Sequence, residues 1–569
     1  MKNIYESLKE KPFSLSEADV AWVKKTYADM DEEEKIGQLF CLIAYSSEEG
    51  YLDFLARKLK VGGIMCRVMS TEEVIKTVTL LQEKSKIPML IAANLEAGGN
   101  GCSISGTRIG CEMAISASKD LDLGDALGEV SGKEGNALGL NWSFAPISDI
   151  DFNFRNPITN TRTFGANPEQ VKDLSVRYIK HCQAHDVAAT FKHFPGDGVD
   201  ERDQHLCTTV NSLSCEQWDT TYEKIYRACI EAGAKACMVG HICLPSYAKK
   251  INPKIADEDI LPASLNYDLC TTLLRERLGF NGLIISDSTT MAGVNGALPR
   301  EKLVPQVIAA GCDMFLFTRN LEEDFSYMKE GVKNGTISPQ RLEEAVIRIL
   351  GFKASLHLHT KNNIPSLEEA NRVLSDPDSK KLARICAEKS ITLVKNKQDV
   401  FPISPDRYPR ILFYPIESGA GQMGYGIDTG ANASLVKKLE AKGFKVTVFK
   451  PKEGFEGMMM SAHEITDNYD LILYSANMAT KSNQTTVRIE WAQPMGANVP
   501  AYIHSVPTVF VSLENPYHLL DVPRVKTYIN TYGSSDVILD CLIEKLMGKQ
   551  PFEGESPVDA FCGKWDTHL

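Results

Sequence analysis

The sequence predicts a TIM-type (β/α)8 barrel followed by an α/β three-layer sandwich domain. Eight short apolar segments recur within the first 320 residues, and helical patterns separate most of them. The segments are apolar almost throughout, which is typical of parallel strands that are buried on both faces. A second, shorter series of apolar segments comes after a polar stretch, which indicates a separate α/β domain.

The barrel prediction depends on the order of strands and helices along the chain. The eight predicted strands span residues 36–44, 62–67, 88–94, 141–146, 188–194, 236–241, 282–288 and 312–317. Helices are predicted at 71–85, 167–185, 214–233 and 264–279. Several of them begin at Ser, Thr or Asn and end at Gly, the usual capping residues. A Rossmann fold is the alternative, but no G-x-G-x-x-G motif comes after an early strand.

The second domain is predicted from the residues on the C-terminal side of the barrel. A helix at 341–358 ends the barrel, and residues 361–381 are polar and contain several Pro, Asp and Ser residues. We therefore expect a catalytic barrel at 1–358, a linker at 359–381 and a sandwich domain at 382–569. Strands of the sandwich are predicted at 390–396, 410–415, 445–450, 469–475, 508–514 and 526–533.

The composition limits the class of partner. The chain has 62 basic and 74 acidic residues, a net charge of −12, which argues against nucleic acid or an anionic membrane. A small neutral substrate such as a carbohydrate is compatible with this charge. The N-terminus has no apolar segment typical of a signal peptide, and the 15 cysteines form no C-x-x-C pair, so we expect a cytoplasmic protein with reduced thiols. Nothing points to a cofactor, and the oligomeric state is left open.

Polar residues lie at the ends of the predicted barrel strands. Active sites of TIM barrels lie at the carboxyl ends of the strands, so these positions predict where the chemistry takes place. The residues are Asn94, Glu96, Asp149, Asp151, Lys192, His193, His241 and Asp287.

The segment KHFPGDGVDERDQHL (192–206) concentrates the most ionisable groups. Lys192 and His193 end the fifth strand, and the Pro and Gly residues after them predict a mobile turn. Farther along, Asp203 precedes His205 by two residues, and a carboxylate beside an imidazole can set its tautomer for proton transfer. A zinc site on His193 and His205 is the alternative, but the spacing matches no metal motif and none is predicted.

Asp287 ends the apolar segment of the seventh strand. A carboxylate there would point into the barrel mouth, where it could act as a nucleophile or stabilise a positive charge. Asp is also a good helix N-cap, and Asp287 could cap a helix in the next segment. The spacing alone leaves both interpretations open.

These motifs resemble glycoside hydrolase family 3 over nearly the whole chain. The sequence KHFPGDG is similar to the best-known signature of the family, and the Asp-x-His pattern after it resembles the β-N-acetylglucosaminidase branch. Further segments that resemble the family are 30–40, 61–67, 88–99, 140–165, 262–291, 387–396 and 514–520, the last two being similar to its second domain.

The resemblance implies a retaining, exo-acting β-N-acetylhexosaminidase. It makes Asp287 the nucleophile and His205, held by Asp203, the general acid and base. Residues that it implies for sugar binding are Lys192, His193, Arg162, Asn94 and Met238. The family usually has an aspartate in place of Asn94, and this branch commonly has an arginine after the paired glycines, where this chain has Asn100.

Other activities on the same scaffold are the alternatives. A phosphorylase or a β-glucosidase would share these residues, and a sugar-binding protein without catalysis would keep only their binding role. In the β-glucosidase branch the acid is a glutamate of the second domain, and Glu490 is the candidate for that role here.

Overall fold

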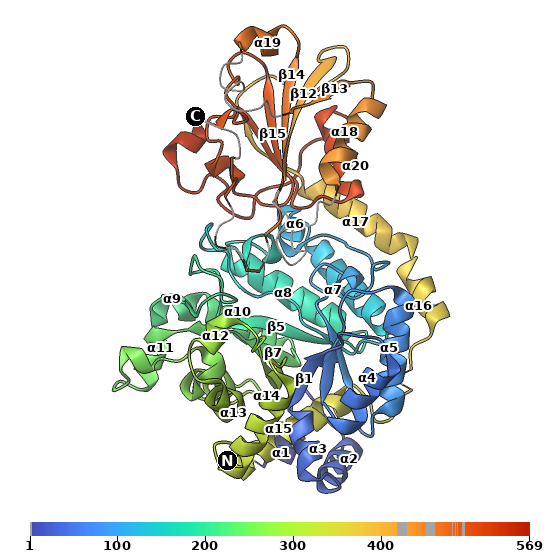
Figure 1. The fold of residues 1–569 in the computed structure, drawn as a ribbon, viewed down its shortest axis with the longest axis vertical. Helices are drawn as coiled ribbons and strands as arrows, with labels where there is room; N and C mark the ends of the chain where they lie inside the picture. The colour runs from blue at the N-terminus through green and yellow to red at the C-terminus, as the bar shows by residue number, and fades with distance from the viewer. Residues whose placement is uncertain are drawn as a thin grey trace. The chain divides into compact units, whose positions relative to one another are not determined.

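The computed structural model describes residues 3–362, 364–417, 430–450, 461–480, 482–483, 485, 488–491 and 496–569 (Figure 1). It divides into two compact units. The first unit consists of Met1–Arg108, Gly124–Asn153 and Pro168–Ser379. The second consists of Ile109–Leu123, Phe154–Asn167 and Lys380–Leu569, so it includes two short segments from the first half of the chain.

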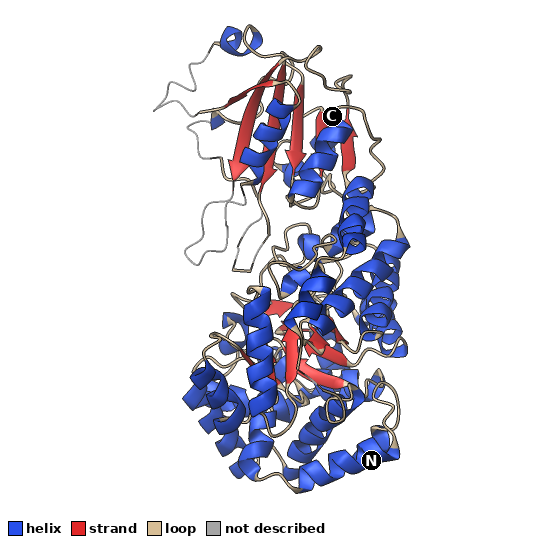
Figure 2. Ribbon diagram, turned by 90° about the vertical axis from the view of Figure 1, so that its right-hand side faces the viewer, coloured by secondary structure: helices blue, strands red, loops and turns tan. Residues whose placement is uncertain are grey.

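The first unit is built on a sheet of eight parallel strands, which helices surround in Figure 2. The strands are β1 (Phe40–Ile43), β2 (Gly63–Met65), β3 (Leu90–Ala93), β4 (Trp142–Ser143), β5 (Ala188–Phe194), β7 (Ala236–Val239), β9 (Leu283–Ser286) and β10 (Phe315–Leu316). Their spatial order is β10-β1-β2-β3-β4-β5-β7-β9. A parallel bridge between Ile285 and Met314 brings β9 next to β10 and closes the barrel, which confirms the predicted fold class.

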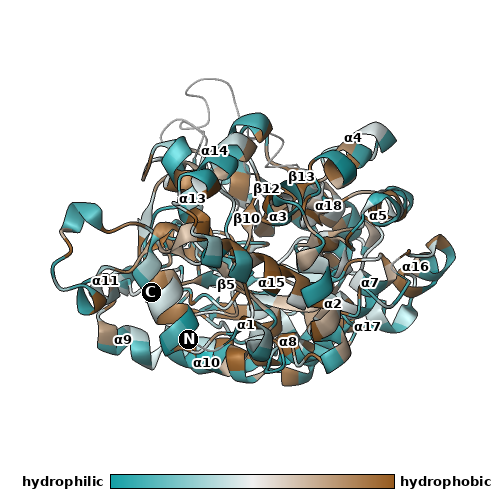
Figure 3. Ribbon diagram, turned by 90° about the horizontal axis from the view of Figure 1, so that it is seen from below, coloured by the Kyte–Doolittle hydropathy of each residue, from teal (hydrophilic) through white to brown (hydrophobic). Residues whose placement is uncertain are grey.

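Helices alternate with the strands as the periodicity predicts. Those of the first unit include α1 (Ile4–Ser7), α2 (Glu17–Ala28), α3 (Glu32–Gln38), α4 (Glu49–Asp53), α5 (Thr71–Lys84), α7 (Leu121–Ala137), α8 (Pro168–Gln183), α9 (Cys215–Thr220), α10 (Tyr222–Glu231), α11 (Pro245–Ile251), α12 (Ala292–Asn295), α13 (Arg300–Ala310), α14 (Leu321–Lys333) and α15 (Pro339–Ser355). Their hydrophilic and hydrophobic faces are visible in Figure 3. No helix among the described residues is long and apolar enough to span a bilayer.

Several elements differ from the sequence prediction in their bounds. The first strand begins at Phe40 and not at residue 36, because the capping box of Asp31 and Glu34 starts α3, which extends to Gln38. The helix predicted at 214–233 is broken at Thr221 into α9 and α10. The stretch 359–381, expected to be a linker, contains α16 (Leu367–Leu374) and the start of α17 (Pro377–Ser390).

The second unit has a six-stranded sheet in the order β11-β16-β15-β14-β12-β13. Its strands are β11 (Thr392–Asn396), β12 (Arg410–Glu417), β13 (Lys445–Val448), β14 (Leu471–Asn477), β15 (Thr508–Ser512) and β16 (Thr527–Asn530), and only β11 runs antiparallel to its neighbour. Helices α18 (Ala431–Ala441) and α20 (Asp536–Leu546) bury residues in one core of the sheet. A second core holds a row of stacked rings, Phe449, Tyr414, Tyr474, Phe510 and Tyr528.

Candidate active site

Asp287 comes directly after β9 and lies at the carboxyl end of the barrel. Its backbone N–H donates to Val239 O at 2.8 Å, and its Oδ1 accepts from the N–H of Ser288 at 2.7 Å. Its Oδ2 is buried and has no hydrogen-bond partner among the described residues. The next helix, α12, is preceded by Met291 at its N-cap. Asp287 is therefore not the N-cap of that helix, which removes the alternative interpretation of this carboxylate.

Opposing effects set the pKa of Asp287. Burial alone would raise this pKa, but the electrostatic effects of His193, His241 and His205 and the hydrogen bond from the Ser288 N–H outweigh burial, so that the pKa lies below its usual value of 3.8. The carboxyl group is thus ionised at neutral pH, which is the state that a nucleophile requires.

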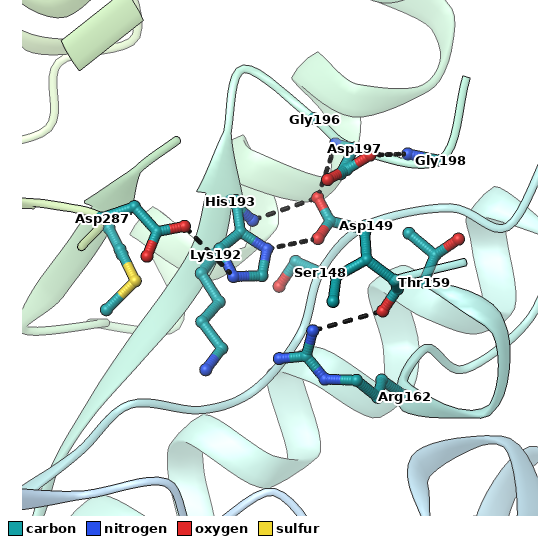
Figure 4. A network of polar contacts seen from close by, with 12 residues as sticks. Ser148, Asp149, Thr159, Arg162, Lys192, His193, Gly196, Asp197, Gly198 and Asp287 are labelled. Atoms are coloured by element: carbon teal, nitrogen blue, oxygen red, sulfur yellow. Dashed lines mark hydrogen bonds and ion pairs between the residues drawn. The ribbon is translucent and has the colours of Figure 1, made fainter. Parts of the chain in front are cut away.

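His193 lies between two carboxylates, as Figure 4 shows. Its Nδ1 is 2.7 Å from Asp149 Oδ2, and its Nε2 is 3.9 Å from Asp287 Oδ2. A carboxylate only accepts hydrogen bonds, so the contact with Asp149 places a proton on Nδ1. Asp149 Oδ1 also accepts from the backbone N–H groups of His193 and Asp197, at 3.0 and 2.8 Å. Asp149 therefore fixes both the ring and the turn after it.

Lys192 is buried at the end of β5 with an acidic partner. Its Nζ donates to Glu96 Oε1 at 2.8 Å and to Asn94 Oδ1 at 3.4 Å. Both partners lie just after β3, so the structure brings together strand ends that are almost a hundred residues apart in sequence, as the barrel predicts. Glu96 supplies a negative charge two residues after Asn94.

Asp203 and His205 form the predicted pair. The side chain of Asp203 is fully buried, and its Oδ1 lies 2.7 Å from His205 Nδ1 and accepts from the backbone N–H of His205 at 2.8 Å. The imidazole of His205 keeps 24% of its surface exposed. The contact directs the Nδ1 proton toward Asp203 and leaves Nε2 for proton exchange.

The loop that carries this pair contacts the segment after Asp287. His205 O accepts from the N–H of Ala292 at 2.9 Å, and Thr208 Oγ1 donates to Gly293 O at 2.5 Å. The turn from Pro195 to Gly198, predicted to be mobile, is buried and held by side chains of neighbouring elements. Trp218 Nε1 donates to Pro195 O at 2.8 Å. The loop of Asp203 and His205 and the segment after Asp287 are thus connected through backbone contacts.

The remaining predicted sugar-binding residues lie in different parts of the chain. Met238 is in β7, beside Ile285 of β9, and is 3% exposed. Arg162 ends a short helix (Asn160–Arg162) in a segment that belongs to the second unit, where its guanidinium donates to Ile158 O at 3.2 Å. Their roles, like those of the other site residues, stay predictions.

Sequence reasoning overlooked one residue that the structure brings into this network. Gln204 lies between Asp203 and His205, yet its side chain contacts Asp197 and the backbone N–H of His241. A glutamine inside a charged loop carries no signal in the sequence, because its buried position depends on the path of the loop. Asp149 and His241 are among the predicted residues at strand ends, but their partners cannot be inferred from spacing.

Two relatives match this chain over nearly its whole length. A protein of Cellulomonas fimi named beta-N-acetylglucosaminidase/beta-glucosidase is 55% identical over 558 residues, which cover 98% of this chain and 99% of that protein. A solved structure of the beta-glucoside phosphorylase BglX superposes with a TM-score of 0.93 at 41% identity, covering 99% of this chain and all of that one.

A more distant structure supports the fold only. The glycoside hydrolase family 3 beta-N-acetylglucosaminidase from Paenibacillus has a TM-score of 0.78 at 23% identity, and the match covers 94% of this chain and all of that one.

The model of the glycosyl hydrolase family 3 N-terminal domain matches residues 32–352, which span the complete barrel. From the strand ends that meet at Asp287 and from these matches, we conclude that the chain is a member of glycoside hydrolase family 3.

Proposed function

We propose that this enzyme releases terminal β-linked N-acetylglucosamine from small carbohydrates by a double displacement that retains the anomeric configuration. The observation that supports it best is the geometry around Asp287, an ionised carboxylate whose loop is hydrogen-bonded to the loop of the Asp203–His205 pair. The name of the Cellulomonas relative includes β-glucosidase activity, so we extend the proposal to β-glucosides.

In the first step, Asp287 attacks the anomeric carbon and His205 donates a proton to the leaving oxygen. The bond from the sugar to the leaving group breaks as the bond to the Asp287 carboxylate forms. His193 and Lys192 would donate hydrogen bonds to sugar hydroxyls, since both side chains have N–H groups at the strand ends near Asp287. Asp203 stabilises the imidazolium form of His205 before the proton leaves.

In the second step, His205 acts as the base. It takes a proton from water, which attacks the anomeric carbon and releases the sugar from Asp287.

Substitution of the nucleophile tests the scheme. We expect Asp287→Asn to lower the turnover of a chromogenic β-N-acetylglucosaminide and of a chromogenic β-glucoside by at least about 10⁴-fold. Mass spectrometry after treatment with a fluorinated slow substrate should find the adduct on Asp287. A chain that binds sugar, cleaves neither substrate and forms no adduct would be a binding protein.

The identity of the acid is tested by a second comparison. We expect His205→Ala to lower cleavage of substrates with poor leaving groups by about 10²-fold or more. Glu490 is exposed in the second unit, and Glu490→Ala should leave this activity unchanged. The reverse result would assign the acid to Glu490.

Phosphorolysis is the second candidate. A histidine that has donated its proton is neutral, whereas a glutamate would then be anionic and would repel an incoming phosphate. The solved structure that is 41% identical to this chain is that of a beta-glucoside phosphorylase. Phosphate should then accelerate turnover and yield a sugar 1-phosphate, which phosphorus NMR detects. Turnover that is independent of phosphate and yields only free sugar supports hydrolysis.

A further inference from the structure

Gln204 is a buried residue on the same loop as the acid/base pair, but its side chain turns away from it. It is 1% exposed. Its Oε1 accepts from the backbone N–H of His241 at 2.9 Å, and its Nε2 donates to Asp197 Oδ2 at 3.2 Å. One amide group thus joins the loop to the end of β7 and to the turn after β5.

Two glycines leave the space that Gln204 occupies. A Cβ atom at Gly240 would lie 3.2 Å from Gln204 Oε1, and one at Gly293 would lie 2.1 Å from Gln204 O. At Gly293 the backbone of the loop approaches more closely than a Cβ atom would allow, and at Gly240 the space beside the amide of Gln204 would be tight for a Cβ. This packing holds the backbone at Gln204 against the segment after Asp287 and leaves its amide little room.

The partner of Gln204 extends this contact to the nucleophile. His241 is fully buried, and its Nε2 is 2.9 Å from Ser288 O, while its Nδ1 is 2.8 Å from Ser264 Oγ. Ser288 in turn donates its backbone N–H to Asp287 Oδ1. A backbone carbonyl only accepts hydrogen bonds, so Nε2 donates to Ser288 O. Burial lowers the pKa of His241 below its usual value. The contacts run without a gap from Gln204 to Asp287.

We propose that Gln204 is a positioning residue that holds His205 at a fixed place relative to Asp287. It does so because Gln204 is the neighbour of both Asp203 and His205 in the chain, and its amide fixes that part of the backbone to the strand ends. The proposal rests on the proposed function, in which His205 is the acid. Gln204 itself touches no reacting atom.

The test compares two leaving groups in the variant Gln204→Met, which keeps the size of the side chain and removes both hydrogen bonds. A dinitrophenyl glycoside departs without protonation, whereas a methyl or benzyl glycoside needs the acid. We expect kcat/KM to fall by about 10²-fold for the alkyl glycoside and by less than about threefold for the dinitrophenyl glycoside. An equal loss on both substrates would show that Gln204 only stabilises the fold and would overturn the proposal.

Two further variants make the result specific. Arg202→Gln is the matched control, because Arg202 lies on the same loop and is mostly exposed, and its guanidinium pairs with Asp200. It should leave both substrates unchanged. Gln204→Leu also removes both hydrogen bonds without adding a charge beside Asp197, and it serves if Gln204→Met does not fold, with the same ratio as the criterion. If His205→Ala lowers kcat/KM equally for both glycosides, the proposed function fails. If His205→Ala affects the alkyl glycoside more but the Gln204 variants affect both equally, only the positioning role fails.

Discussion

His193 lowers the pKa of the carboxylate next to it. It is the first of the three histidines whose charges lower the pKa of Asp287 against the opposing effect of burial. The contact with Asp149 orients its ring, so that Nε2 lies toward Asp287. One residue thereby affects both the geometry and the charge of the site.

Replacement of His193 by Asn should separate these effects. The effect of the imidazole is the largest of those that oppose burial, so the pKa of Asp287 rises without it and the carboxylate is protonated at a higher pH as the solution is acidified. We expect the acidic limb of the kcat/KM profile to move to higher pH, and the maximum to fall about 10- to 100-fold, as for the loss of hydrogen bonds to a charged group. His181→Asn is the control, since the half-exposed imidazole of His181 on α8 contacts Asp125 of α7. An acidic limb that stays in place would contradict this account.

The candidate active site lies on two loops that pack together, the loop after β5 and the segment around α12. Their contact is made by backbone groups, including the N–H of Ala292 and the carbonyl of His205. Gly293 is the closest point, where an added Cβ would lie 2.1 Å from Gln204 O and 2.7 Å from Cys207 O. Backbone atoms on both sides leave no side chain that could move to relieve a clash.

Gly293→Ala should therefore push the two loops apart. We expect kcat to fall at least about tenfold, because a displacement of this size misplaces the proton donor, while circular dichroism shows the native secondary structure. Gly296→Ala on the same short helix is the matched control, since its Cβ would meet only Ala292 O at 3.4 Å. Similar kinetics of the two variants would disprove the packing argument.

The first and last elements of the barrel pack against each other and close it. Strand β1 pairs with β10, and α15 is packed against the first helices. Lys353 of α15 is completely buried and donates to Gln38 Oε1 of α3 at 2.6 Å. Burial lowers the pKa of Lys353 to about 7, so the folded barrel binds this proton less tightly than the unfolded chain does.

This difference predicts how stability changes with pH. Between about pH 7 and about pH 10 the unfolded chain keeps the Lys353 proton that the folded chain loses, so the unfolding free energy rises with pH. Relative to Lys353→Met, the wild type should gain on the order of 2 kcal/mol from about pH 7 to about pH 9 in urea unfolding. Lys333→Met, at an exposed lysine of α14, should show no such difference. A constant difference between wild type and Lys353→Met would refute the prediction.

Much of the architecture can be predicted from the sequence for a simple physical reason. Strands buried on both faces must be apolar throughout, so local composition locates all eight barrel strands. Because parallel strands place their carboxyl ends at one face, the polar residues at those ends are also expected to meet. Lys192 with Glu96 and His193 with Asp287 bear this out.

Other features depend on contacts between residues far apart in the chain. Segments 109–123 and 154–167 belong to the second unit, although they lie within the sequence of the barrel. The Pro and Gly content of the turn at 195–198 predicts mobility, but Trp218 and other buried side chains hold it. Local sequence cannot reveal such partners, since burial is a property of the whole fold.

The sequence alone therefore determined the barrel, the sandwich and the polar residue types at the strand ends, because apolar periodicity and strand ends are local properties. The tertiary structure alone decided how these residues contact one another. It showed that Asp149 orients His193, that nearby histidines lower the pKa of Asp287, and that Gln204 ties the loop of His205 to the end of β7. Hydrogen bonds and charges act through space, and only the folded chain brings these groups within reach of one another.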